Sequence, residues 1–470
     1  MLSSMQGQWF YEQDFAPLPA EIDVGHPPLL PAYLACAWHV FGKSLPVSHW
    51  AMLPFLFGIV AAAHRLARLL VPPNDAVCCA ALMLLHPTLL AQCSLVSPDV
   101  LLVLFFLLAA GEFFKKNASI HRPDTLQHVY SKGFYALWLA ALALTSLRGT
   151  IAVGMIFCAE FTLLFLQTHS SENKPHTASN LALKNLAFAN TVLPYLPAIV
   201  LFLAWYAWHQ ATTGAVGWHN PNAPEFYRSL TDGAGLLKNY AVFVWRLLDF
   251  GAMAVWMVLG IGIITAYWDS KLKTLLTTPV FVLLGVMLLL WLPVIAVVPI
   301  SSIGHRYFLP VQLLASIGAV LILQAWSLRL RQRIRQSIIV ACLLALSTGH
   351  VWALLYPSNV AKGWDSTLAY LPYDALRSKV LQTMTERGIH PSDVASRNCG
   401  VFSEKYIRLN DSNDATFREQ PIAEARYVFW SSVLNGFSDE DLRRLQEWEC
   451  VERAEAWGIA AELRKNPRFP

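Results

Sequence analysis

Residues 97–116 read SPDVLLVLFFLLAAGEFFKK, a polar turn that leads into a long apolar run and ends on two lysines. An α-helix rises about 1.5 Å per residue, so this run is nearly long enough to cross the ~30 Å hydrocarbon core of a bilayer. Cytoplasmic ends of membrane helices are rich in Lys and Arg, which predicts that Lys115 and Lys116 face the cytoplasm. The opposite end, with Asp99, is then expected to face outward.

The composition extends this interpretation to most of the chain. Of 470 residues, 55% are hydrophobic and only 14% are charged, which lies outside the range of soluble proteins. We therefore predict an all-α polytopic membrane bundle. The formal net charge of +4 is too small to suggest a nucleic acid partner, so the partner expected from composition is the membrane itself.

About ten apolar segments are long enough, or nearly so, to be transmembrane helices. Every second connection between them is basic, beginning with HRLARLL at 64–70 and KKNASIHR at 115–122, so these connections are expected in the cytoplasm. The other connections and both chain ends are expected outside. The count stays open by about one or two, because residues 134–168 also fit one broken segment. The segments are 47–70, 77–95, 98–114, 134–149, 151–168, 187–209, 240–267, 279–300, 306–326 and 337–356.

The composition changes near residue 357, where a charged tail begins. Its last part, DEDLRRLQEWECVERAEAW at 439–457, has an amphipathic helical pattern. We expect residues 1–356 to form the membrane domain and 357–470 a small soluble α/β domain on the outer face. Cys399 and Cys450 are either a disulfide or two free thiols there.

Unusual polar side chains all fall at connections that this topology puts outside. Acids and bases on one rim suit a glycosyl transfer from a phosphate leaving group, because a carboxylate takes a proton and planar guanidinium groups hold a phosphate by paired hydrogen bonds. Taken one at a time, each is equally well an interfacial anchor. The set comprises Asp23 and His26 before the first span, Asp99, Arg148, and the run His305, Arg306 and Tyr307.

Four ordered motifs resemble the GT-C superfamily of polyprenyl-phosphate-dependent glycosyltransferases, near the protein O-mannosyltransferase and aminoarabinose transferase group (family 39-like). They are EIDVGHPPLLPAYLACAWHVFG at 21–42, SLVSPDVLLVLFF at 94–106, LTSLRGT at 144–150 and HRYFLP at 305–310. Each motif is weak alone, and the resemblance rests on their order and on the topology. It covers most of the first 330 residues.

The resemblance implies an inverting transferase with a catalytic acid in the first outer loop. Asp23 is the candidate acid and Asp14 its alternative, while Asp99 is a supporting carboxylate. The residues implied to contact the donor phosphate are His26, Arg148, His305, Arg306 and Tyr307. A divalent metal ion held by Asp23 and Asp99 stays open, as do the sugar and the acceptor, which is a lipid, a glycan or a protein. The localisation implied is a bacterial inner membrane, with the C-terminal domain extracytoplasmic.

The start of the chain departs from the family pattern. Family members usually carry a first transmembrane helix that is followed by an acidic motif, and this sequence begins where that motif would end. Either a first helix lies upstream of residue 1, or the short N-terminal tail crosses the membrane unaided. In the first case the catalytic acid precedes residue 1, and Asp23 contacts substrate or supports the fold.

Other readings stay open beside this one. Arg246 and Asp249 are spaced to share one helix face and to pair, either for function or for packing. The outer loop 210–238 either offers acceptor contacts through His219, Glu225 and Tyr227 or is a solvated connector, the commoner case. The bundle also suits a transporter or flippase, or a relative that binds a polyprenyl lipid without turning it over. Transporters, however, tend to show inverted repeats and midplane sites, and the sequence shows no repeat.

Overall fold

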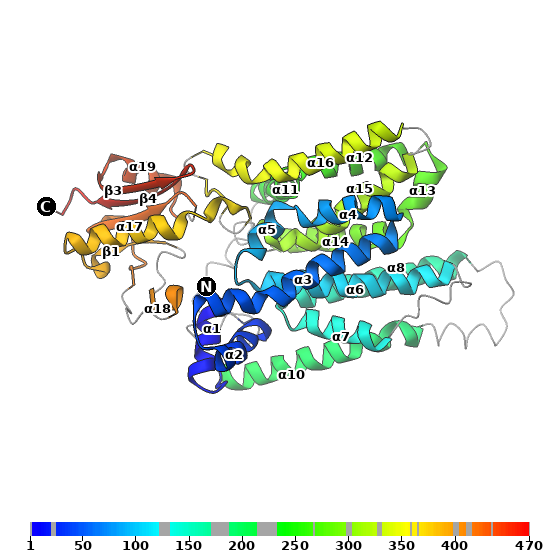
Figure 1. Ribbon diagram of the computed structural model, residues 1–470, viewed down its shortest axis with the longest axis horizontal. Helices are drawn as coiled ribbons and strands as arrows, with labels where there is room; N and C mark the ends of the chain where they lie inside the picture. Colours follow the sequence, from blue (N-terminus) through cyan, green and yellow to red (C-terminus); the bar gives the residue numbers. More distant parts are fainter. Residues whose placement is uncertain are drawn as a thin grey trace.

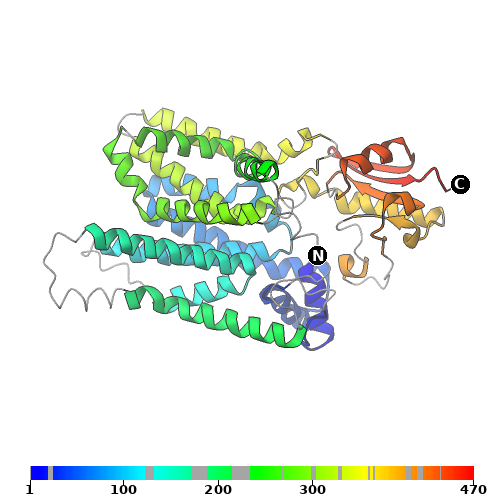
Figure 2. The same ribbon diagram turned by 180° about the vertical axis from the view of Figure 1, so that it is seen from behind.

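The computed structural model describes most of the chain, and Figure 1 shows a helical bundle with a smaller sheet-containing region at one end. The same arrangement is seen from behind in Figure 2. The described residues are 2–19, 25–121, 132–170, 188–213, 233–266, 268–297, 303–326, 331–357, 360–363, 366–397, 404–409, 416–433 and 436–469.

In the described part of the first 356 residues, all regular secondary structure is helical. The α-helices are α1 (Leu2–Glu12), α2 (Leu29–Phe41), α3 (Leu45–Leu70), α4 (Pro73–Leu84), α5 (Pro87–Cys93), α6 (Pro98–His121), α7 (Lys132–Ala143), α8 (Leu147–Ser170), α10 (Leu196–Thr213), α11 (Gly233–Leu248), α12 (Met253–Ala266), α13 (Ser270–Leu276), α14 (Pro279–Val297), α15 (Leu309–Ala325) and α16 (Gln332–Trp352). Short 3₁₀ helices include η1 (Leu193–Tyr195), η4 (His305–Phe308), η6 (Ala353–Leu355) and η7 (Leu368–Tyr370).

Six helices in the described part of the chain are long and apolar enough to cross a membrane, and up to eight if each of two bent pairs is one span. This supports a multi-pass membrane protein with fewer clear spans than the ten predicted. Two of the predicted spans fall short for physical reasons: α6 carries Asp99, Glu112 and two lysines, and α7 is only 12 residues long. The six are Leu45–Leu70, Leu147–Leu166, Phe188–Thr212, Pro279–Ala296, His305–Ala325 and Gln332–Leu355.

Two predicted spans are broken. Helices α4 and α5 meet at 68°, and α11 and α12 at 104°. Pro87 begins α5, and a proline cannot continue the hydrogen bonding of a preceding helix. At the second break Phe250 and Gly251 have φ values of 50° and 83°, which end α11. The apolar runs at 77–95 and 240–267 therefore predicted apolar helical segments correctly but missed the change of direction within each.

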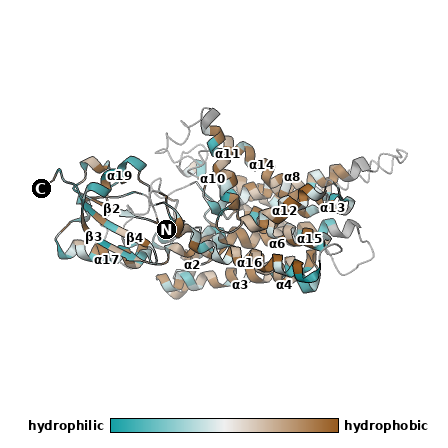
Figure 3. Cartoon of the chain, turned by 90° about the horizontal axis from the view of Figure 1, so that it is seen from above, coloured by the Kyte–Doolittle hydropathy of each residue, from teal (hydrophilic) through white to brown (hydrophobic). Residues whose placement is uncertain are grey.

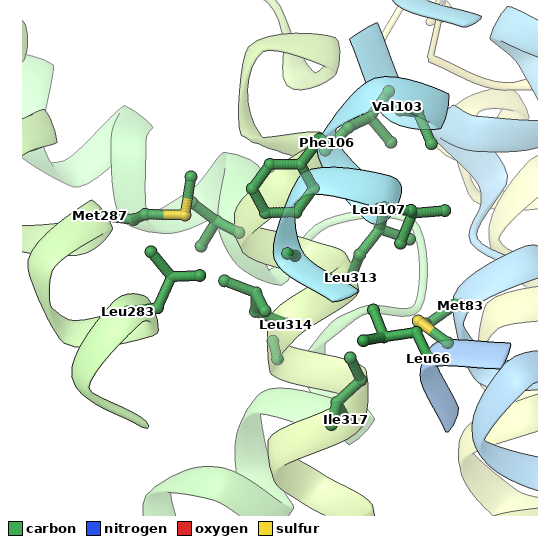
Figure 4. Close-up of a cluster of buried hydrophobic side chains, with 14 of the residues drawn as sticks. Leu66, Met83, Val103, Phe106, Leu107, Leu283, Met287, Leu313, Leu314 and Ile317 are labelled. Carbon is green, nitrogen blue, oxygen red and sulfur yellow. The ribbon is translucent and has the colours of Figure 1, made fainter. Parts of the chain in front are cut away.

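The bundle is organised around α15, because 83% of the apolar stretch within the span His305–Ala325 is buried. Figure 4 shows Leu313 and Leu314 of this helix in one apolar cluster with Phe106 of α6 and Leu283 of α14. Apolar side chains on the outer helices are exposed instead, as Phe57 of α3 is at 72%. Figure 3 shows these helices predominantly brown, the colour of hydrophobic residues. An apolar exterior of this kind suits lipid as the surrounding solvent.

The C-terminal region is built on a mixed four-stranded sheet with strand order β1-β2-β4-β3. The strands are β1 (Val394–Ala395), β2 (Tyr427–Ser431), β3 (Glu449–Ala456) and β4 (Ile459–Lys465), and the helices are α17 (Tyr373–Glu386), α18 (Glu404–Arg408) and α19 (Asp439–Glu447). Strands β1 and β2 are parallel, and the other pairs are antiparallel.

The helical pattern predicted for 439–457 is correct only in its first half. Ser438 caps α19 by accepting a hydrogen bond from the backbone N–H of Asp441, and the helix ends at Glu447. From Glu449 the chain pairs with β4 instead. Backbone pairing with a neighbouring strand thus outweighs the local helical pattern. Cys450 in this strand is exposed and free, while Cys399 lies outside the described residues.

The sheet region docks on the end of the bundle where α5 leads into α6. Ala91 of α5 belongs to a buried cluster with Tyr370, Val380 and Phe429, and the Ser94 and Tyr370 hydroxyls are 2.7 Å apart. This is the Asp99 end of α6, and the lysines of α6 lie at the other end of the helix. The sheet region and the basic connection therefore lie at opposite ends of the bundle.

Candidate functional site

Asp99 stands in the first turn of α6 and is fully buried. The turn before it is held by side chains: the backbone N–H of Asp99 donates to the Ser97 hydroxyl over 3.2 Å, and that hydroxyl donates to the Gln92 side-chain carbonyl. Pro98 starts the helix with the fixed φ that the first helical position favours. The sequence SPD thus directs a carboxylate inward at the end of the bundle beside the sheet region.

Two arginines meet this carboxylate. Arg148, from the start of α8, pairs with Oδ1 of Asp99, and Nε of Arg306, from η4, lies 3.7 Å from Oδ2. The ring of Tyr307 lies against both, with guanidinium carbons at 4.4 and 5.8 Å from its centroid. One carboxylate between two guanidinium groups leaves a net positive charge, which attracts an anion.

His26, in the segment before α2, belongs to the same neighbourhood. Burial, with the positive charges of Arg148 and Arg306, lowers the pKa of its imidazole to about 4. The ring is therefore neutral at pH 7. Its Nδ1 is buried and has no hydrogen-bond partner in the described part of the protein. We call His26, Asp99, Arg148, Arg306 and Tyr307 the arginine cluster.

A second polar cluster forms around Asp249, just beyond the end of α11. Its Oδ2 accepts from the Tyr356 hydroxyl and lies 2.9 Å from Nε2 of His305, while Oδ1 accepts from the backbone N–H of Phe250 over 2.8 Å. The Ser366 hydroxyl lies 3.4 Å from Nδ1 of His305. We call Asp249, His305, Tyr356 and Ser366 the Asp249 cluster.

These contacts revise two expectations from the sequence. His305 was grouped with Arg306 and Tyr307, but it turns to Asp249 and away from the arginine cluster. Asp249 was expected to pair with Arg246, yet the helix ends between them and its oxygens are bonded by His305, Tyr356 and Phe250. The i,i+3 spacing applies only while the helix continues.

The described residues bring neither candidate acid, Asp23 or Asp14, to the arginine cluster. Asp23 lies outside the described residues, as do the loop residues His219, Glu225 and Tyr227. Asp14 is exposed in the turn after α1, with a φ of 46°. Within the described ranges, no hydrogen bond or ion pair joins it to the arginine cluster.

A divalent metal ion does not fit the described carboxylate. Asp99 is already neutralised by two guanidinium groups, which would repel a cation. Among the residues that the structure describes, no group of three or more His, Cys, Asp or Glu side chains could hold a metal ion. The second ligand expected for such an ion, Asp23, is not among them.

A small pocket adjoins the arginine cluster through His26. It is lined by Trp205, Trp208, His209 and Thr212 of α10 and by Leu18, His26 and Pro28 of the N-terminal segment. Residues 187–209 were predicted as a membrane span, and their tryptophans were given no role. The sequence sign of a polar pocket at this place was the presence of Trp and His within one helical turn of an otherwise apolar helix.

The chain matches no known family model, and no curated protein or solved structure is significantly similar to it.

Proposed function

We propose that this protein is a membrane glycosyltransferase that moves a sugar from a polyprenyl-phosphate donor to an acceptor at the outer face. The observation that carries the proposal is the arginine cluster, in which two guanidinium groups flank one buried carboxylate at the end of an apolar bundle. Such a site keeps excess positive charge where a lipid headgroup would lie. The motif resemblance to the GT-C superfamily points the same way.

In the proposed reaction an acceptor hydroxyl attacks the anomeric carbon of the donor sugar. The bond between that carbon and the phosphate oxygen breaks with inversion, and the phosphate leaves with the electron pair. Arg148 and Arg306 stabilise the charge that develops on the leaving phosphate. The proton of the acceptor goes to a carboxylate of the first outer segment, with Asp23 ahead of Asp14.

Within this proposal Asp99 organises the arginines and does no chemistry itself. Its oxygens are occupied by guanidinium groups and by the Ser97 turn, and its side chain is fully buried. With both oxygens engaged in these contacts, the Asp99 carboxylate is not free to contact an acceptor hydroxyl. Neutral His26 can form one hydrogen bond with the headgroup of the sugar-donor lipid through Nδ1, which has no partner among the described residues.

The broken helices favour a second candidate, a transporter or flippase. Transporters build substrate sites from discontinuous helices, and this bundle has two bent pairs. The polar groups described above, however, lie beside the sheet region at one end of the bundle, whereas a transporter site is expected near the middle. We therefore place the transferase first.

The test is transfer from a radiolabelled polyprenyl-phosphate sugar by membranes that contain the wild type or one variant. We expect Arg306→Ala and Asp23→Asn each to lower transfer at least about tenfold, which is the usual effect of losing a charge-stabilising or proton-accepting group. Arg443→Ala, on the exposed face of α19, is the matched control and should leave transfer unchanged. Transfer that is equal in all membranes would remove the site assignment. No transfer by the wild type, with movement of the intact lipid across the bilayer, would favour the flippase.

A further inference from the structure

The short helix η4 sends consecutive side chains into two different clusters. His305 contacts Asp249, whereas Arg306 and Tyr307 face Asp99 and Arg148. Consecutive Cα atoms are only about 3.8 Å apart, so the two clusters share one rigid turn of backbone. A shift of His305 must therefore move Arg306 as well.

Asp249 is the residue to which this turn is fastened. Its side chain is 3% exposed and receives bonds from three parts of the chain: Phe250 in the helix break, His305 in η4 and Tyr356 after η6. Hydrogen bonds to an ionised carboxylate are roughly twice as strong as neutral ones. Three of them fix both the oxygens and the groups that donate to them.

The support beneath Asp249 is tight as well. A Cβ on Gly251 would lie 1.9 Å from the carbonyl oxygen of Ala345, and a Cβ on Gly349 would lie 1.9 Å from that of Phe250. The helix break and α16 thus touch backbone to backbone, which only glycine allows. These close backbone contacts fix the position of Asp249 relative to α16.

We infer that Asp249 and Tyr356 are positioning residues, which act through His305 to set Arg306 and Tyr307 in the phosphate-binding geometry. This inference rests on the proposed function. It assigns a role to a cluster that is joined to the arginine cluster through the backbone of η4. It also explains why Tyr356, after the last membrane helix, returns to a buried carboxylate in the bundle.

Ser366, His305 and Asp249 contact one another in sequence, as in a catalytic triad, so the alternative to a positioning role is that Ser366 is a nucleophile. Ser366 is 3% exposed, and its hydroxyl lies 3.4 Å from His305, beyond the usual range of a nucleophile and its base. A buried hydroxyl at this distance fits a supporting contact. The positioning role uses the same bonds and needs no access to Ser366.

The test measures binding of polyprenyl phosphate to the purified protein in detergent micelles, by tryptophan fluorescence, with phosphate-free polyprenol as the control lipid. We expect Tyr356→Phe and Asp249→Asn to weaken binding of polyprenyl phosphate about five- to twentyfold and to leave polyprenol binding unchanged. Tyr240→Phe is the matched control: its hydroxyl bonds the carbonyl of Leu292 and neither cluster, so binding should not change.

A double-mutant cycle separates positioning from a general loss of structure. If Tyr356 acts through Arg306, adding Tyr356→Phe to Arg306→Ala should weaken binding less than about twofold further, whereas a general destabilisation would give additive losses. Additive effects, or a Tyr356→Phe variant with wild-type affinity, would overturn the inference while leaving the proposed function intact. Failure of the wild type to prefer polyprenyl phosphate over polyprenol would instead remove the proposed function.

Discussion

Replacing Arg148 by methionine should destabilise the protein by about 3 kcal/mol. Asp99 is fully buried and Arg148 is 11% exposed, so the change leaves a carboxylate in the bundle without its closest partner. Breaking a buried ion pair on one side typically costs about 3–5 kcal/mol. Arg306 remains, and at 3.7 Å its attraction to Asp99 is about 4.5 kcal/mol for an effective dielectric constant of about 20, which keeps the loss at the lower end.

The double variant Asp99→Asn, Arg148→Met tests the electrostatic origin of that loss. It removes both charges of the pair, and buried ion pairs can often be replaced by uncharged groups at little cost, so we expect at least half of the stability to return. Phosphate-lipid binding should stay weak, because a guanidinium group is still missing. Stability would be measured by thermal and denaturant unfolding in detergent.

The control is Arg444→Met, which breaks an exposed pair with Glu440 and should change the free energy of unfolding by less than about 1 kcal/mol. An Arg148→Met variant as stable as this control would show that Asp99 does not need its partner. A double variant less stable than Arg148→Met alone would equally refute the reasoning.

Two further outcomes follow from the described contacts. The pKa of His26 is lowered to about 4, so below about pH 6.5 the unfolded chain binds a proton at this residue that the folded protein does not bind. The free energy of unfolding should therefore fall by roughly 2 kcal/mol between pH 6.5 and 5. His26→Gln should reduce this loss, as measured by thermal melts. Gly349→Ala should cost about 3 kcal/mol or more, since its Cβ would overlap the carbonyl oxygen of Phe250, whereas Gly154→Ala in α8 meets no atom within 4 Å and should leave the melting temperature unchanged or raise it.

Charge placement in the sequence was enough to group the residues that the structure brings together around Asp99. Arg148 and Arg306 are far apart in the chain, but both follow apolar runs whose ends the basic connections had already oriented. Helices that cross a bilayer bring alternate connections to the same side, so residues at those connections are expected to lie near one end of the bundle. The charge pattern predicts which connections these are without any knowledge of packing.

Neighbours within that side could not be read in the same way. Adjacent residues point in different directions in a 3₁₀ turn, so the run HRY gave no sign that His305 would leave its two neighbours. Tyr356 and Ser366 were missed because they reach the bundle only when the chain turns back after its last membrane helix. The strand β3 was missed for a related reason, since its helical pattern is overridden by a partner strand later in the sequence.

The two helix breaks and the polar clusters have a common physical cause. Irregular backbone within a membrane is tolerated only where protein or a cavity covers it, because lipid cannot satisfy its N–H and C=O groups. The break at His86 and the break at Asp249 both face α16, and Pro87 and Phe250 both approach Gly349. The break after α11 frees the backbone N–H of Phe250 from helical pairing, and this N–H donates to Asp249 instead. Both breaks therefore lie where α16 covers the irregular backbone.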